Sequence, residues 1–117
     1  MSISRAIDHA ISRYGRRVEL IREGQKTTTY ALVEPLRRKH RLFLNEDSRD
    51  AGRFDASYRH YVGLRTVPLT EGDELSVGGE HYTVIISEEY SYGEEVLYIW
   101  AILKKKTKGL VDDYEDA

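Results

Sequence analysis

Residues 61–104, YVGLRTVPLTEGDELSVGGEHYTVIISEEYSYGEEVLYIWAILK, decide the fold of this chain. Apolar side chains occupy alternate positions within short runs, as at Tyr82, Val84 and Ile86, and glycine-rich or acidic turns close each run. The last run, 96–103, is longer and mostly apolar. Alternation with a period of two, broken by two-residue glycine turns, is typical of antiparallel hairpins. The second half of the chain is therefore predicted to be a β-meander.

The turns and part of the core can be assigned from the same stretch. Gly72 and Asp73 belong to a predicted tight turn, in which glycine can adopt the positive φ that such turns often require. Gly78 and Gly79 form a second predicted turn between two alternating runs. The strands that follow supply three predicted core side chains: Tyr82, Val84 and Trp100.

The first part of the chain contains a predicted helix and two predicted strands. Residues 2–14 carry apolar side chains at three- and four-residue spacing, which predicts an amphipathic helix ended by Gly15. A helix of this length is marginal alone, so it covers the mouth or open edge of its own barrel or docks onto a neighbouring subunit. Residues 17–21 and 27–33 are predicted strands, and Pro35 should interrupt the second because proline cannot donate to a ladder.

Together these elements predict one mainly β domain over residues 1–106. Its expected form is a small antiparallel β-barrel or sandwich of six to seven strands with a short N-terminal α-helix. Residues 45–57, NEDSRDAGRFDAS, lack periodicity and hold one large apolar side chain, Phe54, so a mobile loop is predicted there. Such a long loop either has a function or is a tolerated surface insertion. Residues 107–117 are predicted to be a disordered tail.

Composition removes several classes of chemistry. The 117 residues include no cysteine, which excludes disulfides, thiolate nucleophiles and zinc–sulfur sites. The four histidines show no metal-ligand spacing, and the chain has neither a glycine-rich phosphate loop nor a nucleophile elbow. No apolar run is long enough to span a membrane. The sequence therefore predicts that the protein is not an enzyme and has no metal, cofactor or membrane partner.

The net charge of −2 conceals an uneven distribution. Residues 1–46 hold ten Lys/Arg and five Asp/Glu, whereas residues 47–117 hold eight and fifteen. If the two halves occupy different faces, identical copies could pack head to tail around a ring. If the charges interleave in the fold, they cancel locally. Both arrangements are compatible with the sequence.

A basic run provides the best signal for nucleic-acid binding. The segment 37–41 reads RRKHR and could contact several phosphates. On a strand, however, alternate side chains point to opposite faces, so only about half of them could meet one surface. The run therefore has two possible uses, which are contact with single-stranded nucleic acid and contact with acidic residues of another subunit.

The stretch quoted above also resembles the small head–tail connector proteins of tailed bacteriophages and prophages. The shared phrase has the form Leu-x-x-Gly-Asp-x-Leu-x-Val-Gly-Gly-x-x-Tyr-x-Val and is followed by a strand centred on Trp and Ala-x-Leu. A short N-terminal helix also stands in the expected place. The matching residues are Leu69, Gly72, Asp73, Leu75, Val77, Gly78, Gly79, Tyr82, Val84, Trp100, Ala101 and Leu103.

The resemblance implies a virion structural protein for head closure or head–tail joining. It would form a homo-oligomeric ring between portal and tail, although the isolated chain can be monomeric. Its partners would be portal, adaptor and tail proteins, and DNA would pass through the channel without specific recognition. It would be found in the cytoplasm of the bacterial host during assembly and then in the virion neck, with loop 45–57 ordering on assembly. The alternative is an OB-like small barrel that binds single-stranded nucleic acid.

Candidate contact residues follow from charge and aromatic content. Tyrosine and tryptophan are favoured on surfaces that become buried only on association. A hairpin turn is predicted at residues 90–93, with Tyr90 and Tyr92 in it and two glutamates on either side. We expect the glutamates to face the basic run of a neighbouring copy. Charge reversal at Arg37 and Arg38 should then abolish ring assembly while the monomer stays folded. The candidate interface residues are Arg37, Arg38, Lys39, Arg41, Phe54, Glu88, Glu89, Tyr90, Tyr92, Glu94 and Glu95.

Overall fold

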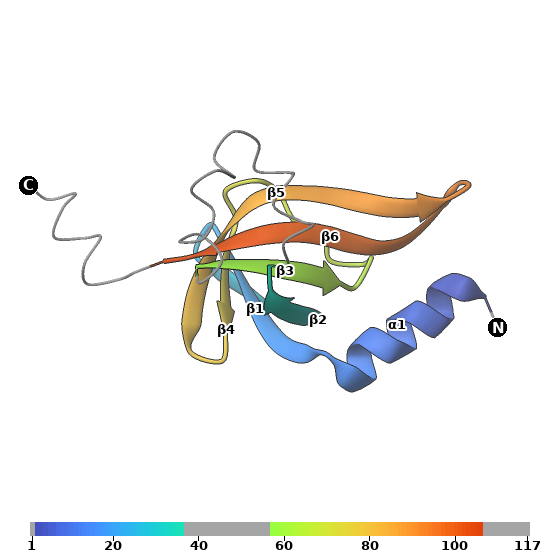
Figure 1. Cartoon of the computed structure of the whole chain (residues 1–117), viewed down its shortest axis with the longest axis horizontal. Coiled ribbons are helices and arrows are strands. Elements are labelled where there is room, and N and C mark those ends of the chain that lie inside the picture. The colour runs from blue at the N-terminus through green and yellow to red at the C-terminus, as the bar shows by residue number, and fades with distance from the viewer. Residues whose placement is uncertain (1, 37–56, 107–117) are drawn as a thin grey trace, which may run out of the picture.

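The computed structural model describes residues 2–36 and 57–106, which form a closed antiparallel β-barrel preceded by one helix (Figure 1). The mainly β fold with a short N-terminal helix is thus confirmed, and the arrangement is a barrel. Six strands are present in this part of the chain. The elements are α1 (Ile3–Tyr14), β1 (Arg16–Arg22), β2 (Gln25–Pro35), β3 (Tyr58–Gly63), β4 (Glu74–Val77), β5 (Glu80–Tyr92) and β6 (Glu95–Lys105).

The strand order around the barrel is β1-β2-β3-β6-β5-β4, and the pairing of β4 with β1 closes it. Strand β2 is long enough to pair with two neighbours in succession. Its residue Ala31 faces Arg16 of β1 on one side and Gly63 of β3 on the other. A closed barrel leaves no free sheet edge where its strands are paired, which protects a small domain from edge-to-edge association.

The barrel interior is filled by the inward-facing residues of all six strands. Tyr82 and Val84, both predicted as core, are 3% and 1% exposed and belong to this cluster. Trp100 was predicted as core but is only half-buried and lies outside the cluster. On β6 its neighbours Ile99 and Ala101 face the interior, so strand alternation turns Trp100 to the outer face.

Helix α1 begins and ends as the sequence predicts. The Ser2 side chain accepts a hydrogen bond from the Arg5 amide at 3.2 Å, and the Gly15 amide donates to the Ile11 carbonyl at 2.8 Å. The helix packs against β6 and β2 of its own barrel. Only part of its apolar surface is used there, because Ile11 is buried while Ile3 remains largely exposed.

Two strands end later than the sequence predicts. Strand β2 runs to Pro35, which pairs with Arg59. The Leu36 amide donates the next bond to the Tyr58 carbonyl, so the Pro35 nitrogen faces the side of β2 where β1 no longer pairs, and no ladder bond is lost there. Strand β5 continues through Tyr90 to Tyr92, so the predicted turn at 90–93 is in fact strand followed by a turn. Its final residues are exposed on both faces and therefore show no apolar alternation.

Candidate functional site

The β5–β6 hairpin extends beyond the barrel as an arm, which we define as residues 86–98. Strand β4 pairs only with residues 80–83 of β5, and β3 pairs only with residues 99–104 of β6. Among the described residues, 90–92 and 95–98 therefore pair only with each other, whereas 86–89 pair with residues 99–102 of β6, which also pair with β3. Figure 1 shows this hairpin running past the barrel along helix α1. Because an isolated two-stranded hairpin is marginally stable, the arm needs support from α1.

Helix α1 supplies that support near the arm tip. The buried Ser4 hydroxyl donates a hydrogen bond of 2.6 Å to Glu95 Oε2. The Glu95 carboxylate thus lies near the N-terminus of α1, where the helix dipole favours negative charge. The helix is held from another direction by an ion pair of 3.0 Å between Asp8 and Arg65, which follows β3. Glu95, predicted to contact a neighbouring subunit, is therefore engaged within its own chain.

The outer face of the arm carries a row of aromatic rings. Tyr90 and Tyr98 lie opposite each other and stack, with ring centroids 4.9 Å apart and planes 5° from parallel. Burial, together with the neighbouring Tyr90, raises the pKa of the Tyr98 hydroxyl. Trp100 continues the row, and the His60 ring meets it edge-on at 6.0 Å. Stacked rings of this kind form a rigid apolar surface.

The arm is also strongly acidic. Residues 86–98 contain four glutamates and neither lysine nor arginine. Glu88 and Glu89 are exposed within β5, whereas Glu94 is exposed in the turn that joins the strands. Tyr90 and Tyr92, predicted as contact residues, are 54% and 71% exposed. The predicted acidic and aromatic residues are therefore gathered on one projecting hairpin.

An ion pair between Asp73 and Arg22 of β1 holds the turn formed by residues 70–73 against the barrel. Arg22 donates to both carboxylate oxygens of Asp73, and the Thr70 amide donates to Asp73 Oδ2 at 2.7 Å. Partial burial alone would raise the pKa of Asp73, but these hydrogen bonds and the Arg22 charge lower it overall. Gly72 has a φ of +94° and donates to the Val84 carbonyl. The predicted turn at Gly72 and Asp73 thus has a structural role.

The second predicted turn lines a shallow hollow. Gly78 and Gly79 have φ values of +58° and +86°, as a two-residue hairpin turn requires. The hollow beside them has a volume of about 330 Å³ and is lined by Arg16, Arg17, Glu19, Ser76, Gly78 and Gly79.

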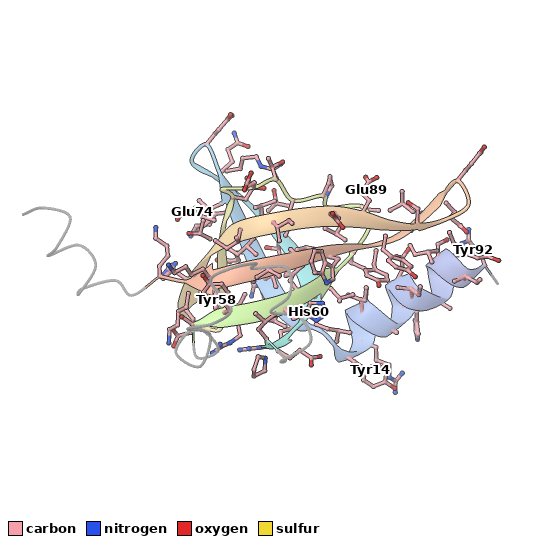
Figure 2. The ribbon with its side chains drawn as sticks, turned by 45° about the horizontal axis from the view of Figure 1, so that its top comes forward. Tyr14, Tyr58, His60, Glu74, Glu89 and Tyr92 are labelled. Carbon is pink, nitrogen blue, oxygen red and sulfur yellow. The ribbon has the colours of Figure 1, made fainter. Side chains whose placement is uncertain are left out.

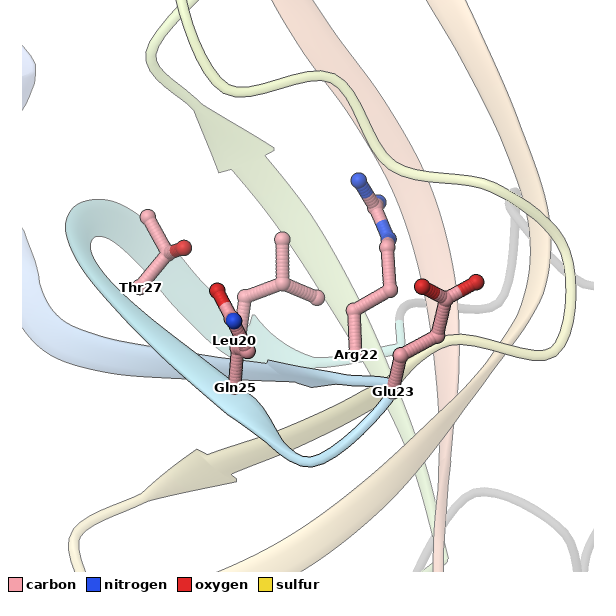
Figure 3. Close-up of a pocket in the computed structure, with 5 residues that line it drawn as sticks. All are labelled: Leu20, Arg22, Glu23, Gln25 and Thr27. Carbon is pink, nitrogen blue, oxygen red and sulfur yellow. The ribbon is translucent and has the colours of Figure 1, made fainter.

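Another hollow, of about 300 Å³, lies at the β1–β2 turn (Figure 3). Its lining is mostly polar, and its Arg22 is already bound to Asp73.

No group of three or more His, Cys, Asp or Glu within 2–36 and 57–106 could hold a metal ion. In the same ranges no helix has both the length and the apolar character needed to cross a membrane. That the chain is not an enzyme stays a prediction.

Several predicted contact residues lie outside the described residues. These are Arg37, Arg38, Lys39, Arg41 and Phe54, together with most of loop 45–57 and the whole of tail 107–117. Their roles stay predictions.

Helix α1 also carries an exposed apolar stripe. The helical spacing in the sequence did not distinguish this stripe from the side of the helix that packs on the barrel. Ile3 and Tyr14 are 55% and 70% exposed, while Ile7 and Ile11 turn inward. A helical projection could have revealed it, because the apolar positions of residues 3–14 cover more than one face.

No protein-family model matches the sequence, and neither a curated protein nor a solved structure matches the chain.

Proposed function

We propose that this chain is a structural protein of a phage or prophage virion, a head-closure or head–tail joining connector that oligomerises into a ring between portal and tail. The observation that carries the proposal is the projecting arm. It presents exposed tyrosines and glutamates beyond the barrel, at a place where they add nothing to the core. Exposed aromatic residues on a supported projection are suited to contacts that become buried on assembly.

The resemblance to connector proteins supports the proposal from a second direction. Its matching residues are mainly core and turn positions, such as Leu75 and Val77 in the interior and Gly78 and Gly79 in a turn. They support a common barrel, and the arm adds an exposed surface to it. In a ring the barrel would serve as the rigid body of each subunit. The acidic arm would steer the approach of a basic neighbour and fix its orientation.

The alternative is a small barrel that binds single-stranded nucleic acid. The aromatic row of Tyr90, Tyr98 and Trp100 favours this reading, because bases stack on exposed rings and Tyr90 is exposed beside its two half-buried neighbours. The charge around the row opposes it, since the arm has four glutamates and no basic residue that could meet a phosphate. The charges on this surface therefore favour a connector over a barrel that binds nucleic acid.

Affinity capture tests the proposal directly. The tagged chain is recovered from a lysate of its host producing phage particles, and bound proteins are identified by mass spectrometry. We expect portal, adaptor or tail proteins, and we expect Tyr90→Ser with Tyr92→Ser to reduce their recovery. Lys26→Ala, an exposed change at the opposite end of the barrel, is the matched control. Recovery of nuclease-sensitive nucleic acid without virion proteins would contradict the proposal.

A further inference from the structure

We propose that the hollow beside Gly78 and Gly79 is a binding site for a phosphate group. Strand β4 ends at Val77, and the turn that follows lies beside the start of β1, where Arg16 and Arg17 stand. The hollow of about 330 Å³ thus forms where two basic residues meet a glycine turn. None of its lining residues belongs to the arm, so this site is independent of the proposed ring.

Arg16 supplies the charge that would hold the ligand. Its guanidinium has no hydrogen bond or ion pair within residues 2–36 and 57–106, although acids stand nearby. Glu19 is paired with Arg17 at 3.5 Å, and Glu80, which directly follows the turn, is paired with Lys105 at 3.1 Å. The lining therefore has two arginines and a single acid, which gives the hollow a net positive charge.

The two glycines leave room for the guanidinium and for a ligand. A β-carbon on Gly78 would overlap Nη2 of Arg16, so the guanidinium lies against the turn in space that any other residue would fill. A β-carbon on Gly79, by contrast, would meet no heavy atom within 4 Å, so the space beside this residue is open. A guanidinium that packs on the backbone loses less freedom when it binds an anion than a side chain extended into solvent.

Neutral donors complete the site. The Gly78 and Gly79 amides donate to no backbone or side-chain acceptor among the described residues, and the Ser76 hydroxyl also has no partner there. Amides of a glycine turn can approach an anion closely because no side chain stands between them. A guanidinium, a hydroxyl and backbone amides are the groups that bind phosphate oxygens in proteins. The number of donors favours a tetrahedral phosphate over a planar carboxylate, which has fewer acceptor oxygens.

The hollow at the β1–β2 turn provides a contrast, because its arginine is already occupied (Figure 3). Arg22 donates to both carboxylate oxygens of Asp73, whereas Arg16 has no such partner in the part of the chain that the structure describes. The acidic arm also lies away from β4. Figure 2 shows Tyr92 at the arm tip and Glu74 of β4 at opposite ends of the molecule. The arm glutamates therefore do not compete for Arg16.

Titration of the full chain with inorganic phosphate tests the site. Amide resonances of the ¹⁵N-labelled protein are followed at constant ionic strength, with sodium chloride as the balancing salt. We expect a saturable shift that is largest at Gly78 and Gly79. Arg16→Gln should raise the Kd about tenfold, because it removes the charged donor. Arg5→Gln, at an exposed arginine of α1, is the matched control and should leave the Kd unchanged.

Glu19→Gln tests the electrostatic argument with the opposite sign. It removes the single negative charge of the lining, so the Kd for phosphate should fall about threefold. A disturbed fold could weaken binding but would not strengthen it at the same amides. The absence of a saturable shift, equal affinities of the native chain and Arg16→Gln, or weaker binding by Glu19→Gln would each overturn the site.

A second titration identifies the source of the phosphate group. Its probe is a short single-stranded oligonucleotide without terminal phosphates, which offers phosphodiesters only. An affinity no higher than that for inorganic phosphate would assign the hollow to a free phosphate or a phosphomonoester. An affinity more than about tenfold higher, lost in Arg16→Gln, would assign it to a nucleic-acid backbone. Failure of both titrations would overturn the phosphate site and leave the ring proposal untouched.

Discussion

The ring of Tyr61 lies directly over Gly63, two residues further along β3. A β-carbon placed on Gly63 would be 2.5 Å from both Cε1 and Oη of Tyr61, well inside contact distance. Both residues face the barrel interior, because side chains two apart share one face of a strand. The pairing partners Ala31 and Ala101 are also small, which leaves room for one large ring at this level of the barrel. The absent side chain at Gly63 is therefore part of the core packing.

Gly63→Ala should destabilise the protein by about 2 kcal/mol, because the added methyl group forces the buried Tyr61 ring out of its place. Urea unfolding measures the change in the free energy of unfolding. Thr28→Ala, at an exposed position of β2, is the control and should change it by less than about 0.5 kcal/mol. Equal stability of Gly63→Ala and the native chain would show that the Tyr61 ring does not occupy this space.

Tyr61→Phe should stabilise the protein. The Tyr61 hydroxyl is buried and has no hydrogen-bond partner among the described residues, so its removal relieves a desolvation cost of about 1 kcal/mol. Burial also raises the pKa of this hydroxyl above its ordinary value. Above about pH 10 the unfolded chain ionises this tyrosine while the folded chain keeps it protonated, so stability falls as pH rises.

The Tyr61→Phe prediction is checked by urea unfolding from about pH 7 to 11, a range that spans the ordinary tyrosine pKa. The native chain should lose stability at the alkaline end, and the variant should lose less of it. Tyr14→Phe, at an exposed tyrosine, is the matched control. A variant that is less stable at neutral pH would indicate that the hydroxyl has a partner.

The sequence predicted the barrel strands well because each has one face in the core. Leu75 and Val77, or Tyr82 and Val84, alternate with half-buried polar residues, and alternation is a local signal. The pairing of β1 with β4 that closes the barrel has no local signal, because it joins segments far apart in the chain. Trp100 was wrongly predicted to be in the core. Because the run that forms β6 is mostly apolar, the sequence does not show which of its alternating residues face the barrel interior.

The sequence predicted which residues belong to the candidate site, but it did not predict how the site is arranged in space. Exposed Tyr90 and Tyr92 among glutamates could be foreseen, because nothing in the alternation required them in the core. Their placement along an extended arm could not, since a strand exposed on both faces has no periodic pattern. The bond between Ser4 and Glu95 joins residues 91 positions apart and depends on how α1 folds back along the arm. Such a contact follows from tertiary structure alone.

Asp73→Asn should destabilise the protein by about 1 kcal/mol near neutral pH, because the amide loses the charge that holds Arg22. The pKa of Asp73 is lowered in the folded chain, so its contribution is complete above the unfolded value of about 3.9 and is lost as pH falls through the folded value. Acid titration of stability should therefore be flatter for the variant. Glu71→Gln, an exposed change in the same turn, is the control; an equally flat acid profile for that variant would remove Asp73 as the cause.

Ser4→Ala should loosen the arm without unfolding the barrel. The change removes the 2.6 Å hydrogen bond to Glu95, worth about 1 kcal/mol, and leaves an unpaired carboxylate beside the helix. Hydrogen exchange should then become faster in residues 86–98, while the amides of the closed barrel keep their protection. Ser12→Ala, at an exposed serine of α1, is the matched control for helix propensity and should leave arm exchange unchanged. If Ser4→Ala accelerates exchange equally in the barrel and the arm, then the arm is not a separately anchored unit, and the hydrogen bond serves global stability instead.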